Sequence, residues 1–172
     1  VGGDNRLGGE LATAHLLRAG ARRIAFLGDE GLPEIRDRLD GYLQAHARAG
    51  VKPIAALRRH TPFVQERILE DVAALVQGPH RFDAIFATSD LMALTAITAL
   101  RRLERRVPED VRVVGYDDIP VAQFFHPALS TVRQPMAEAG EQLVDALLSQ
   151  LAGDPATSRV LETTLVVRES SG

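Results

Sequence analysis

Residues 82–118, FDAIFATSDLMALTAITALRRLERRVPEDVRVVGYDD, contain one complete unit of strand, helix and strand. The apolar run at 84–87 predicts a buried strand. Residues 88–90, Thr-Ser-Asp, are typical helix caps, and they begin a helical pattern that continues to about Leu103. The β-branched run at 111–115 then predicts a second strand. A strand, a helix and a strand in this order are typical of a parallel sheet with helices packed on its faces.

The same alternation of short apolar runs and helical periodicity continues on both sides of this unit. Further strands are predicted at Arg23–Leu27, Pro53–Leu57, near Ser130 and at Arg159–Val167, and further helices at Asn5–Ala19, Glu34–Ala49, Val64–Val76 and Met136–Leu151. We therefore expect an α/β fold of three layers, with a mainly parallel sheet between helices on both faces.

The composition excludes several classes of protein. The 172 residues include no cysteine, so disulfide frameworks, zinc ribbons and thiol catalysis are ruled out. No apolar run approaches the roughly 18 residues that span a bilayer, and no signal peptide opens the sequence. We expect a soluble, cytoplasmic chain without a membrane partner. The net charge of −3 argues against these residues forming a nucleic-acid-binding surface.

No known catalytic or cofactor motif is present in the sequence. It lacks a G-x-S-x-G elbow, a phosphate-binding loop, a G-x-G-x-x-G fingerprint and an H-E-x-x-H zinc motif. The five histidines lie far apart without the spacing of metal ligands. We therefore expect no cofactor, no metal and no enzymatic activity. A small α/β enzyme using Asp117 or Asp118 is kept as a third hypothesis, although no nucleophile or base accompanies them.

Several polar residues are placed where a ligand could bind. Asp117 and Asp118 follow a predicted strand directly, so they should lie at the carboxyl end of the sheet, where open α/β folds bind ligands. An acidic turn without a ligand is an equal alternative. Arg36 and Arg38 should lie in the first turn of a helix, which opposes its dipole and suggests an anionic or hydroxyl-rich partner, unless both are simply solvated. Helix capping alone would account for Ser89.

In combination, the motifs of the chain resemble those of the lactose/galactose-repressor (LacI/GalR) family of bacterial transcription regulators. The motifs are DN-x-x-GG at 4–9, R-x-x-GY at 38–42, the stretch 82–100, VPEDVRVVGYDD at 107–118, HPALSTVRQP at 126–135, and LETTLVVRES at 161–170. The resemblance covers essentially the whole chain.

The resemblance implies a division of the chain into lobes. Members of the family carry an N-terminal helix-turn-helix, a hinge helix and a two-lobed core similar to type I periplasmic binding proteins. The chain would be the latter part of such a core, without the DNA-binding headpiece and most of the first lobe. Residues 1–20 and 134–158 would be helices of the incomplete first lobe, 21–133 the C-terminal lobe, and 159–172 the final strand and tail returning to it.

The resemblance also assigns roles to individual residues. Arg38 and Asp117 match positions that hydrogen-bond the effector. Ser89 and Asp4 match polar positions at the cleft, and Phe63 falls near the place where an aromatic ring commonly stacks on the ligand. An arginine and a carboxylate facing one cleft suit a neutral polyol through charge-assisted hydrogen bonds.

The function implied is that of an effector-binding and dimerisation domain of a LacI-type regulator. The effector would be a sugar or a related small polar molecule, and operator DNA would be bound through an N-terminal domain that is absent from this chain. Leu94, Phe124 and Phe125 match positions that the family uses between the subunits of a homodimer, although both rings could instead pack under their loop. A periplasmic-type sugar-binding protein of a transporter is the alternative function.

The predicted helix at Met136–Leu151 has a broad apolar face. Exposing even three of its large side chains would forgo roughly 1.5–3 kcal/mol for each. We therefore expect this helix to pack on the helix at Asn5–Ala19, to be buried against a second copy of the chain, or to be poorly ordered.

Overall fold

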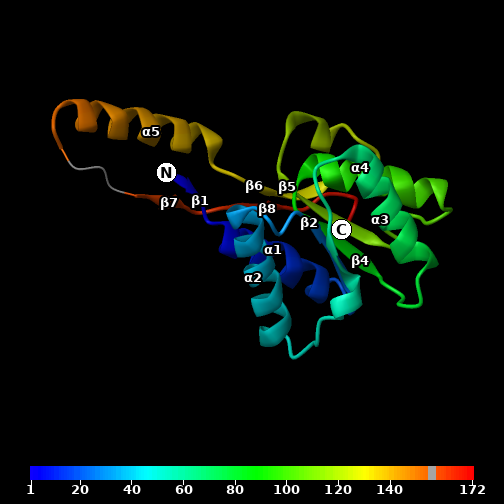
Figure 1. Cartoon of the computed structure of the whole chain (residues 1–172). Helices are drawn as coiled ribbons and strands as arrows, with labels where there is room; N and C mark the ends of the chain where they lie inside the picture. The colour runs from blue at the N-terminus through cyan, green and yellow to red at the C-terminus, as the bar shows by residue number, and fades with distance from the viewer. Residues whose placement is uncertain (155–157) are drawn as a thin grey trace.

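Six strands form the central sheet of the computed structural model, which describes residues 1–154 and 158–172 (Figure 1). The spatial order is β3-β2-β4-β5-β6-β8. All neighbours pair in parallel except β6 and β8, which are antiparallel. The strands are β2 (Ile24–Gly28), β3 (Arg58–His60), β4 (Ala84–Ala87), β5 (Arg112–Asp117), β6 (Ser130–Arg133) and β8 (Thr164–Val166).

Two pairs of helices cover the two faces of this sheet (Figure 1). α1 (Asn5–Arg18) and α2 (Pro33–Arg48) share one core with Phe26 and Phe86 of the strands. α3 (Gln65–Gln77) and α4 (Asp90–Arg102) share a second core with Leu27 and Ile85. Successive strand residues point to opposite faces, so each strand contributes to both cores. The predicted three-layer α/β fold with a mainly parallel sheet is confirmed.

Two glycines allow α1 and α2 to pack unusually close together. A Cβ atom on Gly9 would meet the carbonyl oxygen of Arg38 on α2 at a distance that real Cβ atoms do not show. A Cβ atom on Gly41 would meet the carbonyl oxygen of Arg6 on α1 in the same way. The glycines of the DN-x-x-GG and R-x-x-GY motifs are therefore packing residues, because only a missing side chain lets the two backbones approach.

Two of the predicted strands differ in the structure. The run predicted as a strand at Pro53–Leu57 instead forms a short 3-10 helix, Ala55–Leu57, which buries the Leu57 side chain, and β3 begins only afterwards. β3 lies at the edge of the sheet, where charged side chains are tolerated. The run at Arg159–Val167 divides into β7 (Val160–Leu161) and β8, and β7 pairs in parallel with β1 (Gly2–Gly3) apart from the main sheet.

α1 belongs to the six-stranded lobe, so the assignment of residues 1–20 to the first lobe is corrected. α1 packs along α2, and its Ala12, Leu16 and Leu17 are buried in the core that includes the sheet. The helix packs on α2 and β5, and of its residues only Arg6 and Arg18 are exposed to solvent, while the others are buried or half-buried.

α5 (Met136–Leu151) is ordered and extends away from the sheet (Figure 1). None of its residues is buried, and Leu143, Leu147 and Leu151 are 60%, 56% and 77% exposed. The apolar face is therefore not covered by the rest of this chain, which contradicts the alternative of packing on α1, while burial against a second copy stays a prediction. The segment assigned to the second helix of the first lobe, 134–158, includes residues 155–157, which lie outside the described residues. Of the helices described, none has the length and hydropathy needed to cross a membrane.

Candidate functional site

Arg38 lies buried at the carboxyl edge of the sheet and links three elements. Its Nε donates a hydrogen bond to Asn5 Oδ1 at 2.9 Å, and its Nη1 donates to the carbonyl oxygen of Thr88. The guanidinium carbon lies 3.5 Å from the centroid of the Tyr116 ring, a cation–π contact. Burial lowers the pKa of Arg38, but a guanidinium stays charged in any folded protein.

The helix-dipole argument applies to Arg36 but not to Arg38. α2 begins at Pro33, so Arg36 is in its first turn and Arg38 is in its second. Arg36 is exposed, whereas only 6% of Arg38 is exposed. Arg38 is held by specific partners inside the protein, and simple solvation does not explain it.

Asp117 ends β5 directly beside the ring on which Arg38 stacks. Its Oδ1 accepts a hydrogen bond from Gln134 Nε2 at 2.8 Å. Burial raises the pKa of the Asp117 carboxyl group, while Gln134 and the nearby positive charge of Arg38 lower it. The structure thus brings Arg38 and Asp117 to the same edge. Sequence analysis missed two residues that complete the arrangement, Asn5 and Gln134, although both lie within motifs quoted for the family.

Asp118, the second residue of the aspartate pair, has a structural role. Its two carboxylate oxygens bind Arg133 at 2.6 Å and Arg168 at 2.7 Å. Burial would raise the pKa of Asp118, but the hydrogen bonds from Arg168 and Arg133 outweigh burial, and the pKa is lowered. Because both oxygens are engaged by arginines, Asp118 is poorly suited to acid–base catalysis or to binding a cation.

Asp4 and Ser89 cap helices whose N-termini lie at this edge. Asp4 Oδ1 accepts the hydrogen bond of Leu7 N at 2.9 Å at the start of α1. Ser89 Oγ accepts that of Met92 N at 3.2 Å at the start of α4. Capping accounts for both side-chain types, and each cap fixes one helix end beside the site.

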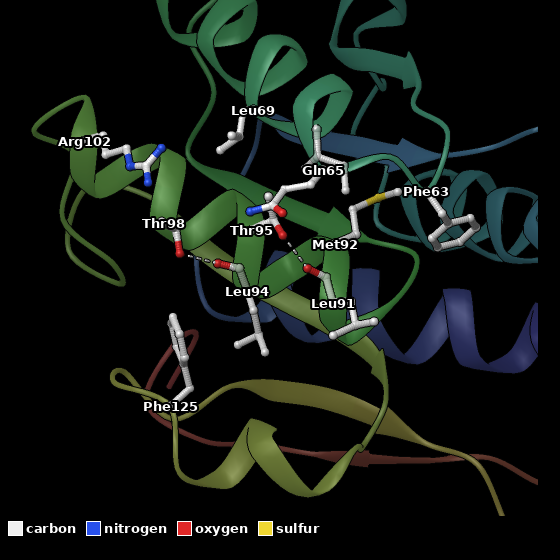
Figure 2. Close-up of a pocket in the computed structure, with 11 residues that line it drawn as sticks. Phe63, Gln65, Leu69, Leu91, Met92, Leu94, Thr95, Thr98, Arg102 and Phe125 are labelled. Carbon is white, nitrogen blue, oxygen red and sulfur yellow. Dashed lines mark hydrogen bonds between the residues drawn. The ribbon is translucent and has the colours of Figure 1, made fainter.

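Phe63 lines a different cleft, between α3 and α4 (Figure 2). This groove has a volume of about 370 Å³ and is bordered by Phe63, Gln65, Ile68, Leu69, Leu91, Met92, Leu94, Thr95, Thr98, Arg102 and Phe125. Phe63 is 48% exposed, and neither Arg38 nor Asp117 is among the residues that border this groove.

Two of the three residues expected between subunits, Leu94 and Phe125, border the same groove. Leu94 is almost buried on α4, and Phe125 packs partly against the core with Arg101 near its ring. Phe124 is 79% exposed, so the alternative in which both rings pack under the loop is not what the structure shows. Sequence analysis missed Leu91, which is 66% exposed and lines the groove.

Comparison with known proteins identifies the family. The model of the periplasmic binding protein-like domain matches residues 13–171. The HTH-type transcriptional regulator CelR of Thermobifida fusca is 39% identical over 97% of this chain and 50% of its own length. The ribose operon repressor of Escherichia coli is 35% identical over 96% of the chain and 51% of its own length. The chain thus spans about half the length of the curated relatives it matches.

Solved structures of LacI-type regulators have the same fold as this chain. A complex of the regulator CelR with cellobiose superposes with a TM-score of 0.92 at 39% identity, covering 98% of this chain and 52% of that one. A dimeric Lac repressor superposes with a TM-score of 0.90 at 28% identity, covering 98% and 62%. The chain therefore belongs to the periplasmic binding protein-like domain family, and it is similar over nearly its whole length to part of several LacI-type transcription regulators.

Proposed function

We propose that the chain binds a sugar at the carboxyl edge of its sheet, as the effector-binding domain of a LacI-type transcription regulator. The observation that carries this proposal is the buried Arg38, stacked on Tyr116 beside the Asp117 carboxylate. Two relatives support a sugar: one was solved in complex with cellobiose, and another is a ribose operon repressor.

The two charged groups have complementary roles toward a sugar hydroxyl. A guanidinium has five N–H donors, and the bonds to Asn5 and Thr88 use two of them. Arg38 therefore has donors left for a hydroxyl oxygen. Asp117 uses Oδ1 for Gln134, and within the described residues its Oδ2 has no hydrogen-bond partner, so it is available to accept from a hydroxyl. A hydrogen bond with one charged partner is stronger than a neutral one.

The proposed function is binding without a reaction. The effector would be held between this lobe and a second lobe, and closure would alter the geometry of DNA-binding heads outside this chain. The relatives named above are transcription regulators, which favours this role over the alternative of a transporter's sugar-binding protein.

Calorimetric titration of the full-length protein with cellobiose, ribose and a panel of related sugars tests the proposal. Arg38→Ala and Asp117→Asn should each weaken binding by about 1.5–3 kcal/mol, roughly 10- to 150-fold, because each removes charge-assisted hydrogen bonds. Arg36→Ala, an exposed arginine two residues away on α2, is the matched control and should bind like the wild type. If Arg38→Ala and Asp117→Asn bound sugar as tightly as the wild type and Arg36→Ala, the assignment of the site would be wrong.

The partner at the groove between α3 and α4 would be a second copy of the chain. Leu91 exposes its apolar side chain in this groove, and Phe124 exposes its ring next in sequence to Phe125, which also borders the groove. Large exposed apolar surfaces often mark protein–protein contacts. A related Lac repressor was solved as a dimer. These observations support a homodimer formed through this surface.

A further inference from the structure

The turn that carries Asp117 has an unfavourable backbone conformation. Asp117 and Asp118 have φ angles of 117° and 57°, and residues other than glycine rarely adopt such positive values. Such residues keep this conformation only where the surrounding structure holds them there, and they are common at ligand-binding positions. The orientation of the Asp117 carboxylate therefore depends on what holds the turn.

Asp90 holds the far side of this turn. It is the first residue of α4 and is fully buried. Its Oδ2 accepts a hydrogen bond from Ile119 N at 2.8 Å, and Ile119 directly follows the two strained residues. These contacts tie the start of α4 to the exit of the turn.

The second oxygen of Asp90 reaches the neighbouring strand. Thr131 Oγ1, on β6, donates to Asp90 Oδ1 at 2.5 Å and accepts a weaker hydrogen bond from Asp118 N at 3.4 Å. A Cβ atom on Gly115 of β5 would collide with the same Oδ1. β5 thus leaves room for this carboxylate, which is hydrogen-bonded to Ile119 just after the turn and to Thr131 on the neighbouring strand.

Asp90 is costly as a purely structural residue. Burial raises the pKa of its carboxyl group, and the charges of Asp117 and Asp118 raise it further, so the ionised group is disfavoured where it lies. Ser89 already supplies the helix cap. A buried charge that destabilises the fold is understandable if its hydrogen bonds fix something that the function needs.

We propose that Asp90 is the positioning residue of the sugar site, which holds the turn at 117–119 so that the Asp117 carboxylate faces the ligand. This inference rests on the proposed function. Without Asp90, the turn would occupy its binding conformation for only part of the time, and the apparent affinity would be the intrinsic affinity multiplied by that fraction.

Calorimetry on the full-length protein, with cellobiose and ribose as the probes, tests the inference through four variants. Asp90→Ala should weaken sugar binding by about tenfold or more. Asp90→Asn, whose amide can still accept from Ile119 and donate to Thr131, should stay within about threefold of the wild type. Thr131→Val removes one of the two bonds and should give an intermediate loss, which keeps the test decisive if Asp90→Ala does not fold.

Asp71→Ala is the matched control, because Asp71 on α3 accepts a hydrogen bond from the strand-end residue Thr61 at 2.9 Å, far from the turn. It should leave sugar affinity unchanged. If Asp90→Ala and Thr131→Val folded and bound sugar like the wild type, or if Asp71→Ala weakened binding equally, the inference would be overturned.

Amide hydrogen exchange gives a readout that does not depend on the sugar. Asp90→Ala should accelerate exchange at Ile119 and across the turn, while Asp71→Ala should leave this segment unchanged. If neither sugar binds the wild type, the proposed function fails, and the exchange data still decide whether Asp90 holds the turn. Unchanged exchange in Asp90→Ala would overturn the inference even if the protein binds sugar.

Discussion

Replacing Asp90 by asparagine should stabilise the protein, and the gain should shrink as the pH falls. Asp90 is fully buried, and burial raises the pKa of its carboxyl group from 3.8 to about 6. A carboxyl group with a raised pKa binds its proton more tightly in the folded than in the unfolded chain. Ionised Asp90 therefore destabilises the folded state above about pH 6, and this cost is relieved as the pH falls from there toward the unfolded value.

The size of the effect follows from the two pKa values. A pKa difference of one between the folded and the unfolded chain corresponds to about 1.4 kcal/mol. The full cost of the ionised carboxylate at about pH 7.5 is therefore roughly 3 kcal/mol. At about pH 4.5 the folded carboxyl group is mostly protonated and the unfolded one mostly ionised, which leaves roughly 1 kcal/mol. The asparagine amide makes weaker hydrogen bonds than the carboxylate, but that loss hardly depends on pH. Comparing the two pH values isolates a change of about 2 kcal/mol.

Urea unfolding of the full-length protein, followed by far-ultraviolet circular dichroism, measures this change. The free energy of unfolding is determined for the wild type and for Asp90→Asn at both pH values. The stability difference between the two proteins at the higher pH is then compared with the difference at the lower pH. Asp71→Asn, which replaces a less buried carboxylate on the neighbouring helix, serves as the control. The reasoning is refuted if the stability difference for Asp90→Asn is the same at both pH values.

Three further substitutions follow from contacts in the structure. Gly9→Ala should lower the free energy of unfolding by about 1–3 kcal/mol through overpacking of α1 on α2, whereas Gly140→Ala, where a Cβ atom meets nothing, should not; urea unfolding compares them. Phe124→Asp should convert the proposed dimer to a monomer in analytical ultracentrifugation of the full-length protein, while the wild type and the exposed Arg36→Asp variant should be dimeric. Asn5→Ala removes the acceptor of the buried guanidinium and should weaken sugar binding by about 1 kcal/mol in calorimetry, a loss that unchanged affinity would contradict.

The layer architecture could be predicted from sequence because its signal is local. Strands that are buried on both faces of a sheet have nearly continuous apolar sequences, and β2, β4 and β5 are of this kind. Each of them can therefore be predicted from its own residues alone. β3 could not be found in the same way. Its sequence, Arg-Arg-His, has no apolar residue, and it forms a strand only because it completes the edge beside β2.

The position of α1 was predicted wrongly because periodicity shows that a helix has a buried face but not what that face meets. Leu7 and Leu11, whose spacing is that of an apolar helix face, are only partly buried, whereas Gly8, Gly9 and Leu16 are buried. The glycines determine the contact, since they admit the α2 backbone and the Tyr116 ring. Close approach of this kind leaves no hydrophobic signal in a sequence.

Parts of the candidate site could be anticipated, since Asp117 follows a predicted strand and Arg38 lies in a quoted motif. Their partners could not, because Asn5 lies 33 residues from Arg38 and Gln134 lies 17 residues from Asp117 along the chain. Only the sheet order brings these pairs together. The same applies to Asp90, whose sequence position indicates a helix start, while its bond to Thr131 spans 41 residues.

The topology places helix N-termini at the carboxyl edge of the sheet, and the side chains there add further donors and acceptors. α2 follows β2 and α4 follows β4, so both helix N-termini face the edge, and the bond from Arg38 to Asn5 places the N-terminus of α1 there as well. Helix N-termini carry partial positive charge and suit electron-rich oxygen atoms. Against this background Asp117 supplies the acceptor that sugar hydroxyls also need, and Arg38 offsets the cost of burying it. A neutral ligand rich in hydroxyl groups, which both donates and accepts, fits this combination better than a purely anionic one would.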